Sequence, residues 1–295
     1  MSILFGRYTL VLCILLFVSA CGTPQTSVVP PSPTPVVSSP TTAIPVVTIP
    51  GSELRTLKST NTGRDYDIYV QLPAGYTEAT WKNYPVLYVL DGQWDFKLLN
   101  SIYGGLLYDQ FIPEMLIVGI TYSGVNPDYE GLRAMDFTPV HVNYHPGSGD
   151  APKFHAFLKD ELIPFIESNY RVDSSQRILM GSSYGGLFTL YALFTEPELF
   201  TGYVSASPAV PYGTQYVFTQ EKEYFNKRQD LPVSLFISVG SLEELAVPVE
   251  SFMKIVEERG YTGLTLKTMV IEGERHAGNK PEAFNRGLRF IFQGE

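Results

Sequence analysis

The chain contains little cysteine, little histidine and few basic residues. Of its 295 residues only 2 are cysteines, Cys13 and Cys21, and only 4 are histidines. Because both cysteines precede residue 22, the rest of the chain has neither a thiol nor a disulfide and must rely on its own apolar core. The 21 Lys and Arg residues against 30 Asp and Glu leave a net charge of −9. Nucleic-acid binding needs clustered positive charge, and this balance argues against it.

Long apolar runs are also scarce, and the most prominent one lies near the N-terminus. Residues 9–20 follow the single charge of Arg7 and end in small residues. The run is too short for a comfortable membrane span, so it predicts a secretory signal peptide over residues 1–20. It ends in V-S-A-C, which resembles the lipobox of bacterial lipoproteins. That resemblance implies a lipidated Cys21 that anchors the chain to the cell envelope; the alternative is a plain signal peptide with an incidental cysteine.

The next segment has no apolar period. Residues 22–50 are rich in Pro, Ser, Thr and Val. Frequent proline excludes helices and sheet ladders and favours extended polyproline II. We therefore predict that residues 21–50, the lipidated cysteine included, are a tether for an extracytoplasmic domain that spans residues 51–295.

The order of apolar patterns in residues 51–295 predicts an α/β domain. Two partly alternating extended segments come first, and short apolar runs then alternate with helical patterns. We expect strands at 52–59, 65–72, 84–90, 115–121, 177–180, 203–206, 233–239 and 264–271, and helices at 153–169, 187–194, 246–259 and 281–292. This alternation implies a mostly parallel sheet with helices on both faces. Ligands of such sheets bind at the carboxyl ends of the strands.

One pentapeptide at a predicted strand end is typical of a nucleophilic serine. Residues 181–185 read G-S-S-Y-G, with Ser183 at the centre. In the G-x-S-x-G pattern the serine sits on a strained strand-to-helix turn that exposes its hydroxyl, and its neighbours two residues away must be small. An apolar strand precedes the pentapeptide and an apolar helix follows it, as this interpretation requires. We predict that Ser183 is the nucleophile of a serine hydrolase with the α/β-hydrolase fold.

The order of residues along the chain identifies one candidate base and two candidates for the acid. In this fold the catalytic residues follow the order Ser, acid, His, and His276 is the only histidine after Ser183. The acid is expected in the loop after residues 235–240, which contains Glu243 and Glu244. We favour Glu243, which would fix the tautomer of the imidazole, and hold Glu244 in reserve. The alternative is a Ser-His dyad with both carboxylates at the surface.

Two backbone N–H groups should form the oxyanion hole. Tyr184 follows the nucleophile and is expected to supply one. The loop after the strand at 84–90 should supply the other, and Gln93 is our candidate, with Gly92 allowing an unusual turn.

Several segments together resemble the bacterial putative-esterase family, which includes enterochelin-esterase-like enzymes, feruloyl esterases and mycolyltransferases. The matching segments are LPAGY at 72–76, PVLYVLDG at 85–92, RAMDFTP at 133–139, GSSYGG at 181–186 and GERHAG at 273–278. The resemblance implies ester hydrolysis by a Ser-His-acid set with no metal and no organic cofactor. The family more often uses Asp as the acid, and Glu243 departs from that pattern.

Arg133 and nearby aromatic residues are candidates for substrate binding. Arg133 is expected on a loop near the pocket, where it would pair with a substrate anion or stack on a catechol ring. The alternative is a structural salt bridge with Asp136. Trp94, with Tyr122 and Tyr184, would line an aromatic pocket. His141 and His145 have a spacing that holds metal on a helix, but here they fall in a loop with no acid between them, so we predict no metal site.

These observations lead to one main hypothesis and two alternatives. The main hypothesis is an extracytoplasmic carboxylesterase that acts on a small-molecule ester, for instance of a siderophore. The first alternative is a carbohydrate esterase that releases feruloyl or acetyl groups. The second is a catalytically silent lipoprotein that binds a siderophore or a glycan.

Overall fold

An eight-stranded sheet forms the centre of the structure, in the strand order β1-β2-β4-β3-β5-β6-β7-β8. The strands are β1 (Ser52–Lys58), β2 (Asp65–Gln71), β3 (Tyr84–Val89), β4 (Leu116–Tyr122), β5 (Val172–Ser182), β6 (Gly202–Ala206), β7 (Ser234–Gly240) and β8 (Thr265–Ile271). β2 pairs antiparallel with both β1 and β4, whereas every pair from β4 through β3 to β8 is parallel. The predicted mostly parallel sheet is confirmed.

This computed structural model describes residues 47–294. The predicted signal peptide (1–20), Cys21 and all but the last residues of the tether (21–50) lie outside the described residues. Within residues 47–294, no helix combines the length and the apolar character needed to cross a membrane.

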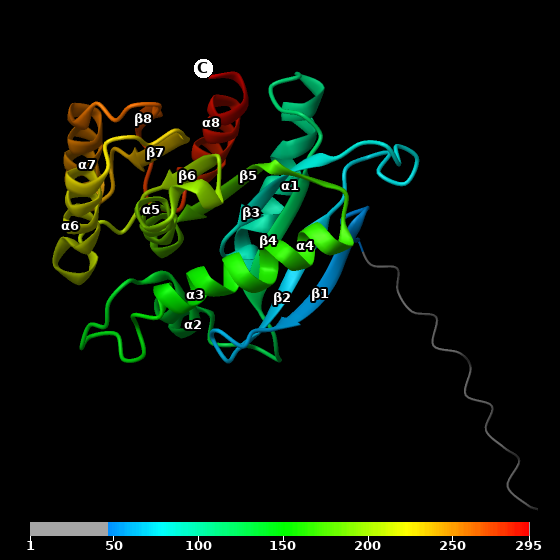
Figure 1. Ribbon diagram of the computed structural model, residues 1–295, viewed down its shortest axis with the longest axis horizontal. Coiled ribbons are helices and arrows are strands. Elements are labelled where there is room, and N and C mark those ends of the chain that lie inside the picture. Colours follow the sequence, from blue (N-terminus) through cyan, green and yellow to red (C-terminus); the bar gives the residue numbers. More distant parts are fainter. Residues whose placement is uncertain (1–46, 295) are drawn as a thin grey trace, which may run out of the picture. The chain divides into compact units, whose positions relative to one another are not determined.

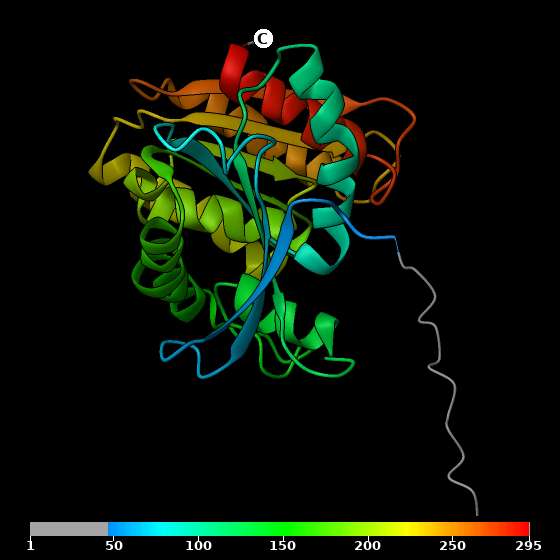
Figure 2. The same ribbon diagram turned by 90° about the vertical axis from the view of Figure 1, so that its right-hand side faces the viewer.

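Helices cover both faces of the sheet (Figures 1 and 2). They are α1 (Gly92–Tyr108), α2 (Tyr129–Phe137), α3 (Ala151–Phe157), α4 (Ile163–Asn169), α5 (Tyr184–Thr195), α6 (Tyr212–Lys227), α7 (Ala246–Arg259) and α8 (Lys280–Gln293). α1 and α8 bury Phe96, Leu99, Phe284 and Leu288 against one face. The other helices pack against the opposite face in a larger core that includes Phe154, Phe188 and Phe252. Burial on both faces explains why β3 and β4 are apolar throughout.

The helix expected over 153–169 is interrupted. α3 and α4 are joined by a single π-helical turn, Leu158–Leu162, and Pro164 lies in the first turn of α4. Proline has no N–H to donate and its ring collides with the preceding turn, so the regular ladder cannot run through this position. The irregular turn lies where that conflict arises.

β5, β6, β7 and β8 are parallel neighbours in the sheet, so their carboxyl ends lie next to one another along the same end of the sheet. The residues that follow these four ends are Ser183, Ser207, Ser241 and Glu272. The parallel strands all finish at this end of the sheet, so the segments after them are brought together. This end of the sheet is where the sequence predicts the chemistry.

Candidate active site

Ser183 lies on a strained turn between β5 and α5. Its backbone angles are φ 61° and ψ −119°, which non-glycine residues rarely adopt. A Cβ atom added to Gly181 would lie 2.5 Å from the backbone of Gly185, so the turn closes only with a glycine at position 181. The strand-turn-helix geometry expected for G-x-S-x-G is present.

Backbone hydrogen bonds hold this turn from the neighbouring strand end. The N–H of Ser183 donates to the carbonyl of Ala206 at 3.0 Å. The carbonyl of Ser183 accepts from the N–H of Ala209 at 3.1 Å and from that of Leu187 at 2.9 Å. These bonds offset the cost of the unusual backbone and fix the direction of the serine side chain.

His276 is hydrogen-bonded to Glu243. The distance from His276 Nδ1 to Glu243 Oε2 is 2.6 Å. The Glu243 side chain is only 1% exposed, whereas the His276 side chain is 45% exposed. Glu244 is exposed and makes no ion pair within residues 47–294. The structure therefore brings Glu243, and not Glu244, to the imidazole.

The ionised form of Glu243 is stabilised by its partners. Burial alone would raise the pKa of this carboxyl, but hydrogen bonds from His276, Ser207 and the Gly240 N–H outweigh it and lower the pKa below its usual value. With Glu243 as an anion, Nδ1 of His276 donates the hydrogen bond to Oε2, and in the neutral imidazole Nε2 is then the acceptor. An imidazole in this state can accept a proton from a serine hydroxyl.

The two expected oxyanion donors lie at helix starts. Tyr184 begins α5, and Gln93 is the second residue of α1. N–H groups in the first turn of a helix have no acceptor within that helix, and the helix dipole favours negative charge beside them. The side chain of Gln93 is fixed, because its Oε1 accepts a 2.8 Å hydrogen bond from Thr121 Oγ1.

The unusual turn before α1 is made by Asp91 rather than by Gly92. Asp91 has φ 55°, in the left-handed region. Gly92 is required for a different reason: a Cβ there would lie 2.9 Å from the backbone of Gly119 and Ile120. The glycine allows α1 to start close to β4, and the expectation about its turn was wrong.

Arg133 is a structural side chain, but its partner is not the one predicted. It lies on helix α2 and not on a loop. Its Nε and Nη2 donate to the two oxygens of Asp91 at 2.9 and 2.7 Å. The alternative salt bridge with Asp136 is contradicted, because Asp136 is paired with Arg64 and accepts from Tyr66 Oη at 2.7 Å. Arg133 and Asp136 lie one helical turn apart, but each is paired with a residue from another segment, Asp91 and Arg64 respectively.

Aromatic rings lie around the same guanidinium. The Cζ atom of Arg133 is 5.6 Å from the ring centroid of Trp94 and 5.4 Å from that of Tyr184. Trp94 is 43% exposed and contacts Tyr129. Tyr184 is held by a 3.0 Å hydrogen bond between its Oη and Nε2 of His145. Trp94 and Tyr184 thus form an aromatic surface beside the serine turn.

Two further sequence interpretations concern Tyr122 and the spacing of His141 and His145. Tyr122 is only 5% exposed and belongs to the core, so it is not part of the aromatic surface formed by Trp94 and Tyr184. His145 contacts Tyr184 rather than His141, and no group of three or more His, Cys, Asp or Glu side chains within residues 47–294 is arranged to hold a metal.

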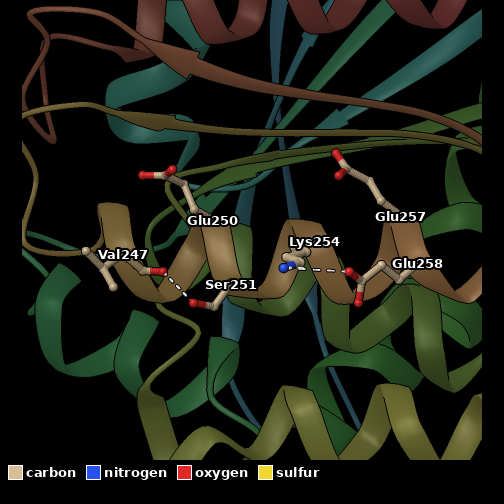
Figure 3. Close-up of a pocket in the computed structure, with 6 residues that line it drawn as sticks. All are labelled: Val247, Glu250, Ser251, Lys254, Glu257 and Glu258. Atoms are coloured by element: carbon tan, nitrogen blue, oxygen red, sulfur yellow. Dashed lines mark hydrogen bonds and ion pairs between the residues drawn. The ribbon is translucent and has the colours of Figure 1, made fainter.

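A hollow of about 360 Å³ lies beside His276. It is lined by Leu242, Glu243, Glu244, Leu245, Arg275 and His276. A larger hollow of about 630 Å³ lies on the outer surface of α7, where Lys254 pairs with Glu258 along the helix (Figure 3). Its serine, Ser251, donates to the carbonyl of Val247 in its own helix. The α7 hollow contains no histidine, and Ser183 does not line the hollow at His276. The candidate active site is therefore defined by the Ser183 turn and the His276–Glu243 pair.

Ser207 and Asn279 were not identified from the sequence. Both side chains are fully buried next to Glu243. Ser207 follows a strand end, which is a signal that sequence analysis can use. Asn279 lies three residues after His276 in a polar loop and carries no recognisable motif.

Comparison with known proteins identifies the family of the chain. The model of the family described as Putative esterase matches residues 59–272. The chain is 27% identical to the ferri-bacillibactin esterase BesA of Bacillus subtilis (strain 168) over 266 residues, which cover 82% of this chain and 90% of that protein. It is 31% identical to the apo-salmochelin esterase of Escherichia coli O6:H1 over 159 residues, 51% of this chain and 48% of that protein.

Solved structures show the same similarity. The BES protein from Bacillus cereus superposes with a TM-score of 0.75 at 28% identity, covering 86% of this chain and 99% of that one. The family match spans most of the chain and the sheet and helices have the α/β-hydrolase arrangement, so the chain belongs to the Putative esterase family and is a carboxylic ester hydrolase.

Proposed function

We propose that the protein is a serine carboxylesterase that works through an acyl-enzyme intermediate. The observation that carries this proposal is the strained Ser183 turn together with the His276–Glu243 hydrogen bond at the same end of the sheet. The motif and the chain order predict Ser183 and His276, and they favour Glu243 with Glu244 in reserve. Glu243, rather than Glu244, is the acid of this proposal.

The proposed reaction has two halves. His276 Nε2 accepts the proton of Ser183 as Oγ attacks the ester carbonyl, and the N–H groups of Tyr184 and Gln93 stabilise the oxyanion. The protonated imidazole then donates that proton to the leaving alkoxide, which departs as an alcohol. Water, deprotonated by His276, attacks the acyl-Ser183 ester, and the imidazolium returns that proton to Ser183 Oγ as the acid is released. Glu243 stays ionised and stabilises the imidazolium in both halves.

The proposed substrate is an ester of an iron-chelating siderophore with aromatic rings. The named relatives BesA and the apo-salmochelin esterase support this choice, as do Trp94 and Tyr184 beside the Ser183 turn. Exposed rings offer a stacking surface for planar aromatic groups. Two nitrogens of Arg133 are hydrogen-bonded to Asp91, so this guanidinium is not free to pair with a substrate anion. Arg133 instead supports the stacking surface through its cation–π contacts with Trp94 and Tyr184.

A substrate panel tests the proposal. Purified protein is assayed with a triscatecholate lactone, a feruloylated sugar, an acetylated sugar and p-nitrophenyl butyrate. We expect hydrolysis of the lactone with the highest kcat/KM, and Ser183→Ala should abolish turnover of every member. Preferred release of ferulate would instead support the carbohydrate-esterase alternative. Unchanged turnover by Ser183→Ala would refute the mechanism, and binding of the lactone without hydrolysis would support the silent lipoprotein.

We further propose an extracytoplasmic location through a lipidated Cys21, with residues 22–50 as the spacer. The support is the lipobox-like V-S-A-C segment and the proline-rich composition that follows it. This location would place the esterase where siderophores enter the cell.

A further inference from the structure

The carboxylate of Glu243 is held by more than His276. Its Oε1 atom accepts a 2.7 Å hydrogen bond from Ser207 Oγ and a 2.6 Å hydrogen bond from the N–H of Gly240. Asn279 Nδ2 also donates to Oε1. Three donors thus converge on one oxygen, which leaves Oε2 directed at the imidazole.

Asn279 joins the carboxylate to the loop that carries the histidine. Its Nδ2 lies 2.7 Å from Ser207 Oγ and 3.1 Å from the carbonyl of His276. The Asn279 side chain is fully buried, and its backbone N–H donates to the carbonyl of Arg275 at 3.1 Å. One amide therefore contacts both partners of the His276–Glu243 pair.

Ser207 joins the same carboxylate to the nucleophile turn. Its backbone has φ 42°, an uncommon value for serine, and its N–H donates to the carbonyl of Ser238 at 2.7 Å. The residues around it, Ala206 and Ala209, make the backbone hydrogen bonds to Ser183 described above. Segment 206–209 thus contacts Ser183 through its backbone and Glu243 through the Ser207 hydroxyl.

A glutamate in this position needs such support. Its side chain has one more rotatable bond than that of aspartate, and more conformational freedom must be removed to hold its carboxylate in place. The space is also restricted, because a Cβ on Gly240 would lie 2.8 Å from Glu243 Oε1. Fixed donors at Oε1 leave the carboxylate a single arrangement in which Oε2 meets His276.

We propose that Ser207 and Asn279 are positioning residues for ester hydrolysis, which fix Glu243 against His276 and couple that pair to the Ser183 turn. This inference rests on the proposed function, in which Glu243 is the acid. Neither side chain touches the reacting atoms, so their loss should reduce kcat and leave KM unchanged.

The test compares three variants of the whole protein. Ser207→Ala removes a single oxygen, and Asn279→Asp keeps the volume while replacing the amide donor by an acceptor. Ser238→Ala is the matched control, because this buried hydroxyl on β7 has no hydrogen-bond partner within residues 47–294. Activity is measured with p-nitrophenyl acetate and by labelling of Ser183 with a fluorophosphonate. The far-downfield proton NMR signal of His276 Nδ1–H reports the hydrogen bond to Glu243.

We expect kcat to fall about tenfold in Ser207→Ala, since it loses one hydrogen bond to a charged group, and further in Asn279→Asp. The downfield signal should broaden or disappear in both, and Ser238→Ala should match the parent protein. Thermal unfolding is recorded for each variant. If Asn279→Asp does not fold, Ser207→Ala alone decides the question.

The inference would be overturned if Ser207→Ala and a folded Asn279→Asp both showed the kcat of the parent protein and an intact downfield signal. Ser183→Ala and Glu243→Gln are assayed in parallel to separate this failure from failure of the proposed function. If Glu243→Gln is fully active, Glu243 is not the acid. If Glu243→Gln is impaired while Ser207→Ala and Asn279→Asp are not, only the positioning role is wrong.

Discussion

At the scale of single residues, two adjacent glutamates have different surroundings. The sequence narrows the acid to Glu243 or Glu244, and the choice depends on the turn after β7, which no residue pattern specifies. In the structure the Glu243 side chain is buried against His276 and Glu244 is exposed. A carboxylate without a fixed partner cannot orient an imidazole.

The acid assignment is tested by two matched substitutions. Glu243→Gln should reduce kcat by a factor of about 100 or more, because the amide does not stabilise the imidazolium as an anion does. Glu244→Gln, which removes an exposed charge from the next position, should stay within about twofold of the parent. Steady-state kinetics with p-nitrophenyl butyrate measure both. Equal, small losses would favour a Ser-His dyad.

Glu243 also makes protein stability depend on pH. The pKa of the Glu243 carboxyl in the folded protein is lowered from its usual value of 4.5. The ionised carboxylate therefore stabilises the fold at pH values above 4.5, and this stabilisation is lost as the pH falls through the folded-state pKa. The difference in unfolding free energy between the parent and Glu243→Gln should therefore shrink as the pH falls below about 4.5. Urea unfolding from pH 7 to pH 3 measures it. A difference that stays constant over this range would contradict the shifted pKa.

At the scale of elements, the strands were predicted more completely than the helices. Residues 84–90 and 115–121 are apolar throughout, which is a strong signal because both faces of those strands are covered. α1, α2 and α6 were not predicted. α1 contains Gly104 and Gly105 and starts directly after the β3 turn, and α2 was interpreted as a loop on its R-x-x-D motif. Most helices in proteins are stabilised by tertiary contacts, which the chain order does not reveal.

The contact between α2 and the turn before α1 makes a quantitative prediction. Arg133→Met leaves Asp91, whose side chain is fully buried, without its paired charge. Removing one partner of a buried pair costs about 3–5 kcal/mol. Urea unfolding should show this loss, and the double variant Arg133→Met with Asp91→Asn should recover part of it.

An exposed pair serves as the control for that prediction. Lys159 and Glu196 form a salt bridge with side chains 47% and 33% exposed. Lys159→Met should cost about 1 kcal/mol or less, because solvent screens such a pair. Similar losses in Arg133→Met and Lys159→Met would mean that the Arg133–Asp91 pair does not stabilise the fold.

At the scale of the whole molecule, the prediction from sequence covers more than the structure describes. The predicted domain at 51–295 includes the entire sheet, and the proposed nucleophile, acid and base follow β5, β7 and β8. Ser207 and Asn279 were missed because a buried polar residue without a motif is recognised only from its neighbours in space. Residues 1–46, with the predicted signal peptide and Cys21, lie outside the described residues.

The anchoring proposal is tested on the full chain. Expressed in a bacterium that processes lipoproteins, the parent should partition with the membrane fraction and incorporate labelled palmitate, because acyl chains on Cys21 bury in lipid. Cys21→Ala should be released and unlabelled, whereas Cys13→Ala should behave as the parent. Membrane association of Cys21→Ala would contradict the lipoprotein proposal.

The aromatic residues near the Ser183 turn and the residues around Glu243 come mostly from different parts of the chain, which bears on how the substrate of this esterase could change. Trp94, Tyr129 and His145 come from segments before β5, whereas Ser207, Glu243, His276 and Asn279 come from segments after it. Mutation of the earlier segments therefore leaves the hydrogen bonds of Glu243 untouched. Selection, or a protein engineer, can therefore vary Trp94 and Tyr129 and keep the hydrogen bonds of Glu243, provided that the buried Arg133–Asp91 pair stays in place.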